Sequence, residues 1–133
     1  ASDNDWETVK KGGDIEIKKW IDGQLNGRTC TVVLIGEETA GRKWIDYEIE
    51  SSWNGKKGVL GINIHNLKNS DGVQSKKGSN PFSKFTFGKE KKPMTSVVKT
   101  YDPPYTDSKE VYDYISKNLS QWIEDAVTAR NSI

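Results

Sequence analysis

The chain has 133 residues, enough for one domain with a single core, and its 20 lysine and arginine residues against 19 acidic residues leave a net charge of +1. This balance creates no long-range field toward nucleic acid or an anionic membrane, so neither is an expected partner. The single cysteine excludes an internal disulfide and a multi-cysteine metal site.

No apolar run approaches the roughly 20 residues that a membrane span requires, and no signal peptide is visible. We therefore expect a soluble protein that works in the cytoplasm. The chain starts with Ala1 rather than methionine, so this expectation does not cover a targeting segment upstream of Ala1.

Two helices and two strands are predicted in the first half of the chain. Residues 14–25 follow two glycines and carry apolar side chains at helical spacing, which predicts a helix. Residues 29–35 are apolar without alternation, as in a strand covered on both faces, and Cys30 within them is expected to be buried and inert. A second helix is predicted over residues 43–56 and a second strand over residues 58–64.

The second half holds a polar loop, a strand and a long helix. Residues 66–93 are rich in Gly, Ser, Asn and Lys and read as a long excursion at one edge of a single domain that spans residues 1–133. Residues 95–100 are predicted as the last strand, and residues 107–130, with apolar positions at steps of three and four, as the last helix.

The order of these elements indicates parallel βαβ units, and hence an α/β fold with a doubly wound sheet. Three strands are few for this class, and the chain begins with a loop and a helix. We therefore expect a further strand and helix upstream of Ala1 in the parent protein.

A glutamate lies near the edge of the sheet where ligands of this fold class bind. In open α/β sheets that edge is formed by the carboxyl ends of the strands, and the helix predicted over residues 43–56 starts from the loop after the first strand. Trp44 and Glu48 are about 40° apart on that helix, at the shoulder of its apolar stripe. From the residues alone, Glu48 as a solvated surface side chain and Trp44 as a packing residue stay open as alternatives.

Other candidates are weaker. His65 follows the second predicted strand, but the spacing suggests no serine or cysteine partner, so a structural role is favoured. The loop from Gly36 to Gly41 matches neither the Walker pattern nor the dinucleotide fingerprint. The chain shows no clear Asp/His cluster, so no metal site is predicted.

The stretch TCTVVLIGEETAGRKWIDYEIESSW at residues 29–53, followed by GKKGVLGINIHNLK at residues 55–68, resembles the TIR-like domain of the Thoeris antiviral defence proteins. The similarity extends to Lys-Gly-Ser-Asn-Pro-Phe at residues 77–82 and runs from Trp6 to about Phe82. It implies a flavodoxin-like three-layer sandwich with a central parallel sheet, here without its first strand and helix. It also implies cleavage of NAD between nicotinamide and ribose, with a cyclic ADP-ribose isomer as the signal of the Thoeris type.

The resemblance implies catalytic and substrate-binding roles for the residues of this chain that match the family's motifs. The TIR motif of a tryptophan four residues before a catalytic glutamate falls on Trp44 and Glu48. Thr39, after the VVLIG run, and Trp6 are implied as further substrate-binding residues. Residues 3–13 match the mobile loop beside the TIR active site. NAD enters as a substrate rather than a cofactor, and self-association through TIR-type surfaces is implied as well.

A lone carboxylate suits this chemistry. Nicotinamide leaves NAD as a neutral molecule, so the main requirement is stabilisation of an oxocarbenium-like ribose, which Glu48 would provide, while Trp44 or Trp6 would stack on nicotinamide. Sequence does not choose between hydrolysis and cyclisation. The competing hypothesis is a non-enzymatic flavodoxin-like signalling module that acts through protein contacts. A flavin carrier is disfavoured because the loops lack a Ser/Thr-rich phosphate site.

Overall fold

Three parallel strands form the central sheet in the computed structural model, which describes residues 29–68 and 71–133. β1 (Cys30–Ile35) pairs with β2 (Gly58–Asn63), and β2 pairs with β5 (Lys99–Tyr101), giving the order β1-β2-β5. β1 and β2 are nearly continuous buried runs, as predicted for strands covered on both faces. The helix predicted over residues 14–25 lies outside the described residues.

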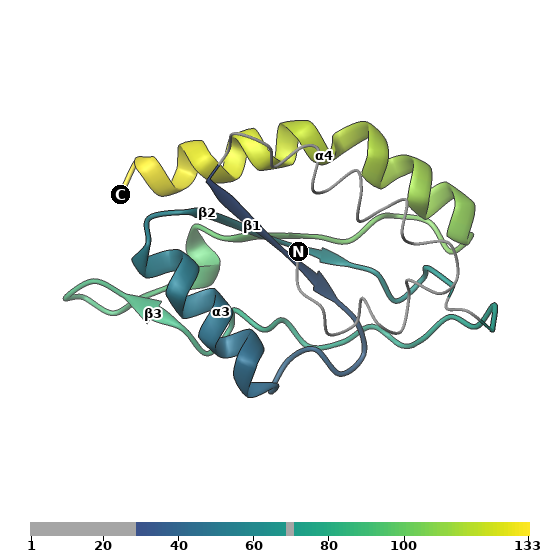
Figure 1. The fold of residues 1–133 in the computed structure, drawn as a ribbon, viewed down its shortest axis with the longest axis horizontal. Coiled ribbons are helices and arrows are strands. Elements are labelled where there is room, and N and C mark those ends of the chain that lie inside the picture. The colour runs from purple at the N-terminus through teal and green to yellow at the C-terminus, as the bar shows by residue number, and fades with distance from the viewer. Residues whose placement is uncertain (1–28, 69–70) are drawn as a thin grey trace.

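Two helices cover the opposite faces of this sheet (Figure 1). Along β1, Val32 and Leu34 join the core beneath α4 (Ser108–Asn131), while the alternate residues Val33 and Ile35 join the core beneath α3 (Lys43–Asn54). This alternation follows from the two-residue period of a strand. The predicted α/β fold, with helices on both faces of a parallel sheet, is confirmed.

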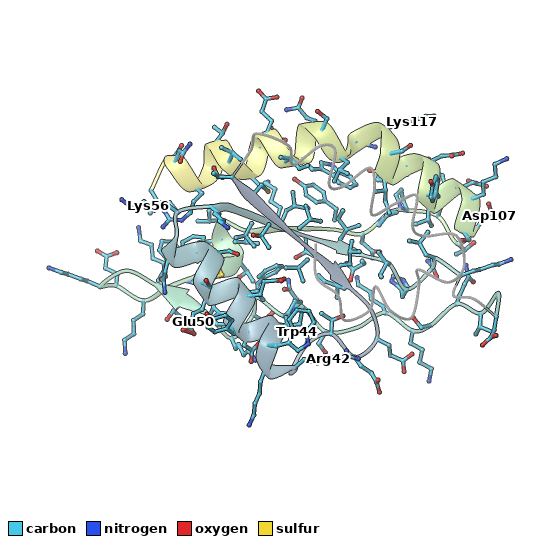
Figure 2. The ribbon with its side chains drawn as sticks, viewed as in Figure 1. Arg42, Trp44, Glu50, Lys56, Asp107 and Lys117 are labelled. Carbon is cyan, nitrogen blue, oxygen red and sulfur yellow. The ribbon has the colours of Figure 1, made fainter. Side chains whose placement is uncertain are left out.

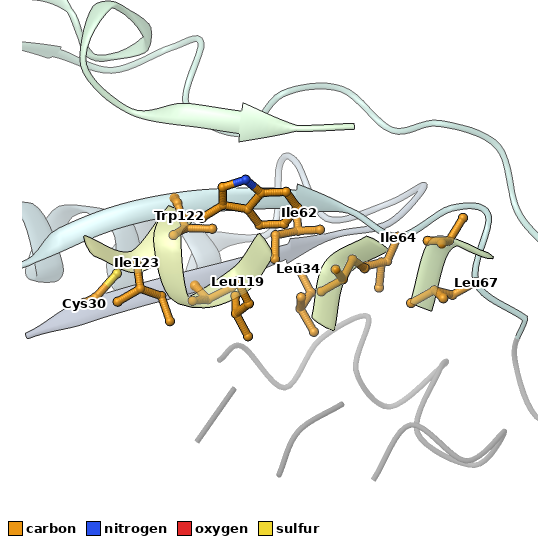
Figure 3. Close-up of a cluster of buried hydrophobic side chains, with 12 residues drawn as sticks. Cys30, Leu34, Ile62, Ile64, Leu67, Leu119, Trp122 and Ile123 are labelled. Atoms are coloured by element: carbon orange, nitrogen blue, oxygen red, sulfur yellow. The ribbon is translucent and has the colours of Figure 1, made fainter. Parts of the chain in front are cut away.

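The α4 side has the longer helix and the more regular core. Figure 3 shows Leu34 and Ile62 from the strands against Leu119, Trp122 and Ile123 of the helix. The buried residues of α4 recur at the predicted steps of three and four: Val111, Ile115, Leu119, Trp122 and Ile123. Cys30 belongs to the same cluster and is buried, as predicted.

The α3 side is covered partly by a helix and partly by irregular chain. Ile45 and Ile49 of α3 pack beside Phe82, which is fully buried although it lies in the predicted polar excursion. A Cβ on Gly61 of β2 would come within 2.8 Å of the Phe82 ring, so a glycine is needed where this ring packs against the sheet. Part of the excursion therefore belongs to the core.

The predicted last strand, residues 95–100, has the wrong bounds. Met94–Ser96 forms a 3-10 helix, η2, and the strand β5 begins only at Lys99. The backbone N–H groups of Val97 and Val98 both donate to the carbonyl of Met94, at 3.0 and 2.9 Å. These donors are therefore engaged in a turn and cannot pair with β2.

The excursion also contains a hairpin that the sequence did not predict. β3 (Thr86–Phe87) pairs antiparallel with β4 (Lys92–Pro93), and Phe87 packs against Trp53 at the end of α3 with ring centroids 5.0 Å apart. Within the described ranges, no helix is both long enough and apolar enough to cross a membrane.

Candidate functional site

An open groove runs along α3 toward the beginning of β1 and contains Glu48. Its volume is about 410 Å³, which is in the range of small-molecule pockets. The lining combines aromatic, hydroxyl and charged side chains: Cys30, Thr31, Trp44, Tyr47, Glu48, Ser51, Ser52 and Lys57. Glu48 is the only carboxylate and Lys57 the only ammonium among these residues.

The helix presents one continuous face to the groove. Trp44, Tyr47, Glu48 and Ser51 are spaced by three and four residues, which places them side by side on α3. Trp44 is 42% exposed and Tyr47 is 74% exposed, whereas Glu48 is half-buried between them and the core stripe that contains Ile49. Figure 2 shows Trp44 at the start of the helix, next to Arg42. Glu48 thus lies at the shoulder of the buried face.

A hydroxyl pair joins the helix to the edge strand within the groove. The Oγ1 atom of Thr31 and the Oγ atom of Ser52 are 2.8 Å apart and share a hydrogen bond. Ser52 is buried, and Thr31 is half-buried near the beginning of β1. This contact links the end of α3 to the beginning of β1 within the groove.

Thr39 has a different setting from the other predicted site residues. Its side chain is fully buried, and its Oγ1 accepts a hydrogen bond from the N–H of Gly36 at 2.8 Å while lying 3.4 Å from the carbonyl of Leu34. These contacts tie Thr39 to the start of the loop after β1 and to the end of β1 itself. This placement suits a residue that shapes the loop, and Thr39 is not among the residues that line the groove.

The carboxyl ends of the strands, where the sequence placed the ligand, are crossed by residues 74–84, here called the rim segment. It contacts the chain beyond each strand in turn: Gly78 lies against Gly36, the N–H of Ser75 donates to the carbonyl of His65 at 2.9 Å, and Lys77 pairs with Asp102 at 2.9 Å. His65 is half-buried at this crossing. The open volume that contains Glu48 therefore lies beside β1 rather than above all three strand ends.

Several residues of the groove were missed from the sequence. Helical spacing from Trp44 and Glu48 would have found Tyr47 and Ser51, because each lies three residues beyond one of them. The pairing of Thr31 with Ser52 depends on how the helix docks on β1, and no sequence pattern indicates it. Trp6 lies outside the described residues, so its predicted role stays a prediction.

The groove has the chemical means to bind an organic cation or a sugar with developing positive charge. A half-buried carboxylate attracts such charge more strongly than a fully solvated one, because less water screens it. Trp44 offers an exposed aromatic surface for stacking within one helical turn of Glu48. In the part of the chain that the structure describes, no three His, Cys, Asp or Glu side chains gather in a way that would hold a metal ion.

Comparison with known proteins identifies the family of this chain. Residues 1–69 of the 133 match the family described as "Thoeris protein ThsB, TIR-like domain". A relative from Bacillus cereus (strain MSX-D12), named "Putative cyclic ADP-D-ribose synthase ThsB1", is 43% identical over 77 residues, which are 58% of this chain and 40% of the relative. The match thus spans less than half of that protein. The matched family region covers more than half of this chain and includes Trp44 and Glu48, and the chain belongs to the Thoeris ThsB TIR-like family.

Proposed function

We propose that this protein cleaves NAD between nicotinamide and ribose and releases an ADP-ribose or a cyclic ADP-ribose isomer as a signal in bacterial antiphage defence. The observation that carries the proposal is the half-buried Glu48, one turn after the exposed Trp44, in an open groove of a Thoeris TIR-like chain. The name of the Bacillus cereus relative, a cyclic ADP-D-ribose synthase, supports the same reaction class.

The reaction breaks the bond between the nicotinamide nitrogen and the anomeric carbon of the ribose. The bonding electron pair stays on nicotinamide, which leaves as a neutral molecule, and the ribose develops positive charge. The carboxylate of Glu48 stabilises this charge electrostatically, an effect worth a few kcal/mol when the group is fixed in place. Attack by water then gives ADP-ribose, whereas attack by a nucleophile on the adenosine half gives a cyclic product.

The remaining groove residues suit binding and orientation of the substrate. Trp44 provides the stacking surface for the nicotinamide ring, and the exposed ring of Tyr47 extends that surface. Thr39 shapes the loop that leads to α3, and Trp6 is a second stacking residue in this proposal. NAD takes part as the substrate, with no bound cofactor.

The setting of the reaction is also part of the proposal. We place the protein in the cytoplasm, where NAD is available, and expect it to self-associate through TIR-type surfaces. Sedimentation velocity at increasing protein concentration, with and without NAD, tests the second point. A single monomeric species at every concentration would contradict it.

Product analysis tests the proposed reaction. Purified protein is incubated with NAD, with and without an extract of phage-infected host cells, and the products are separated by chromatography and identified by mass. We expect nicotinamide and an equal amount of ADP-ribose or a cyclic isomer in at least one of the two conditions. If nicotinamide is released in neither condition, the protein is not an NAD-cleaving enzyme.

A further inference from the structure

The start of α3 is not held by a side-chain cap. The N-cap residue, Arg42, makes no side-chain hydrogen bond to the first turn of the helix. A helix whose first N–H groups lack such a cap is less firmly fixed at that end. Trp44 lies in this first turn and Glu48 one turn later, so the placement of both depends on other contacts.

The first of these contacts joins the rim segment to the loop before α3. The Oε1 atom of Glu37 accepts a hydrogen bond from the backbone N–H of Lys76 at 3.0 Å. Two residues later, Gly78 passes so close to the loop that a Cβ added to it would lie 2.1 Å from the carbonyl oxygen of Gly36. Backbone occupies both sides of this approach, so a larger residue at position 78 must move the loop.

The second contact joins the rim segment to α3 itself. Lys84, at the end of the segment, forms an ion pair with Asp46 in the first turn of the helix. Between these two contacts the segment is anchored in the core by Phe82, whose side chain is fully buried. The rim segment therefore holds the incoming loop at one end and the first helical turn at the other, with a fixed point between them.

We propose that the rim segment positions α3, with Glu37 and Gly78 as positioning residues that set where Trp44 and Glu48 lie in the groove. This inference rests on the proposed function, because its consequence for catalysis is seen only if Glu48 acts on NAD. Loss of either contact lets the loop from Gly36 to Arg42 shift, and the first turn of α3 shifts with it. Neither residue is among those that line the groove, so a change at either position leaves the side chains of the groove in place.

Misplacement of a catalytic group by about 1 Å can lower a rate by about 100-fold. For Gly78→Ala, where the backbone must move, we expect kcat for NAD cleavage to fall on the order of ten-fold or more. For Glu37→Ala, which removes one exposed hydrogen bond, we expect a loss of a few-fold. In both variants kcat should fall by a larger factor than KM rises, because Glu48 interacts most strongly with charge that develops in the transition state.

Two variants serve as controls for Glu37→Ala. Glu37→Gln keeps an acceptor oxygen for the Lys76 N–H and should restore kcat to near the wild-type value. Glu38→Ala removes the neighbouring exposed carboxylate, for which the structure gives no side-chain contact to the rim segment, and should leave kcat unchanged. If the charge of Glu37 mattered rather than its hydrogen bond, Glu37→Gln would lower kcat as well. If loss of any carboxylate from this loop were enough, Glu38→Ala would also lower kcat.

A readout that does not depend on activity separates this inference from the proposed function. The indole N–H signal of Trp44 in a two-dimensional NMR spectrum, assigned with Trp44→Phe, should shift in Glu37→Ala and Gly78→Ala but not in Glu38→Ala. If wild-type protein does not cleave NAD, the proposed function fails and the indole signal alone decides the positioning role. Unchanged Trp44 signals in both positioning variants, or wild-type kcat in both, would overturn the inference.

Discussion

The two helices on either side of the sheet are fixed in different ways. α4 spans 24 residues, and the carboxylate of Asp107 caps it by accepting a hydrogen bond from the N–H of Glu110 at 3.1 Å. α3 spans 12 residues, lacks a side-chain cap at Arg42, and turns the exposed aromatic rings of Trp44 and Tyr47 away from the core. The structural helix is specified by its own sequence, whereas the helix with the candidate catalytic residue depends on a segment far along the chain.

This difference has a physical reason. A helix that presents binding groups to a groove leaves part of its surface uncovered, and so gains less from burial than a helix that serves only the core. On α3, contacts with the rim segment at the beginning of the helix offset this smaller stabilisation from burial. At the end of α3, Arg130 of α4 has the same role. The guanidinium of Arg130 donates to the carbonyl of Trp53 at 2.9 Å and lies 4.5 Å from the centre of its ring.

The largest expected loss of stability comes from Trp53, and Trp44 on the same helix α3 serves as its comparison. Trp53 is 8% exposed and packs against Phe87 and Arg130, so Trp53→Ala should lower the free energy of unfolding by about 3–5 kcal/mol. Trp44 is 42% exposed, so Trp44→Ala should cost about 2 kcal/mol less than Trp53→Ala and should also raise KM for NAD. Urea denaturation and steady-state kinetics measure the two effects.

Equal destabilisation by the two substitutions would show that Trp44 packs as firmly as Trp53. The face of α3 that lines the groove would then be part of the core. The distinction between exposed Trp44 and buried Trp53 on this helix would be wrong.

A smaller effect is expected at the cap of α4. Asp107→Ala should lower the free energy of unfolding by about 1 kcal/mol, because the N–H of Glu110 loses its partner. Asp107→Asn keeps an acceptor at the same position and should restore most of this loss. NAD cleavage should be unchanged in both variants, since Asp107 is not among the residues that line the groove. A cap that mattered only through its charge would leave Asp107→Asn as unstable as Asp107→Ala.

The smallest effect concerns pH and the Tyr101 side chain on the α4 face. Burial, and then the negative charges of Asp125 and Cys30, raise the pKa of the Tyr101 hydroxyl above its usual value of 10.0. Its ring stacks on Trp122 with centroids 4.2 Å apart. Because the folded state holds this proton more tightly than the unfolded chain, the stabilisation is complete below pH 10 and is lost as the pH rises through the folded-state pKa.

The melting temperature should therefore fall as the pH rises above 10, by a small amount that Tyr101→Phe reduces. Tyr47→Phe is the matched control, because Tyr47 is 74% exposed and should leave the pH dependence as in the wild type. Identical alkaline profiles for the wild type and Tyr101→Phe would contradict the stated cause.

Clear apolar patterns made most of the fold predictable. The observed bounds of β1, β2, α3 and α4 lie within two residues of those predicted, because the two helices have apolar positions at helical spacing and the two strands are short apolar runs. The strand predicted at residues 95–100 starts too early because the chain turns there. Val98 is buried beneath the α3 side as a strand residue would be, but its N–H donates to the carbonyl of Met94 in η2. Apolar composition predicted burial correctly and the backbone path wrongly.

The candidate site was predictable only where it lies on one element. Helical spacing placed Trp44 and Glu48 on one face of α3, and the structure places both on the same groove. The contacts that fix this face come from Lys76, Gly78 and Lys84, which the composition of their segment assigned to a polar loop. Long-range backbone contacts leave no periodic pattern, so only the fold brings them together.

NAD cleavage by Glu48→Gln and Glu50→Gln, measured side by side with the wild type, tests the central claim most directly. The two glutamates lie on the same helix about 160° apart, and Glu50, labelled in Figure 2, is exposed and is not among the residues that line the groove. Each substitution removes one charge from α3 and keeps the size of the side chain. Glu50→Gln is an exposed substitution and should cost less than about 0.5 kcal/mol. The melting temperature of both variants is recorded, so that loss of cleavage by folded Glu48→Gln protein is separated from unfolding. We expect Glu48→Gln to abolish nicotinamide release and Glu50→Gln to keep the wild-type rate. Equal rates in the two variants would show that Glu48 is not the catalytic carboxylate.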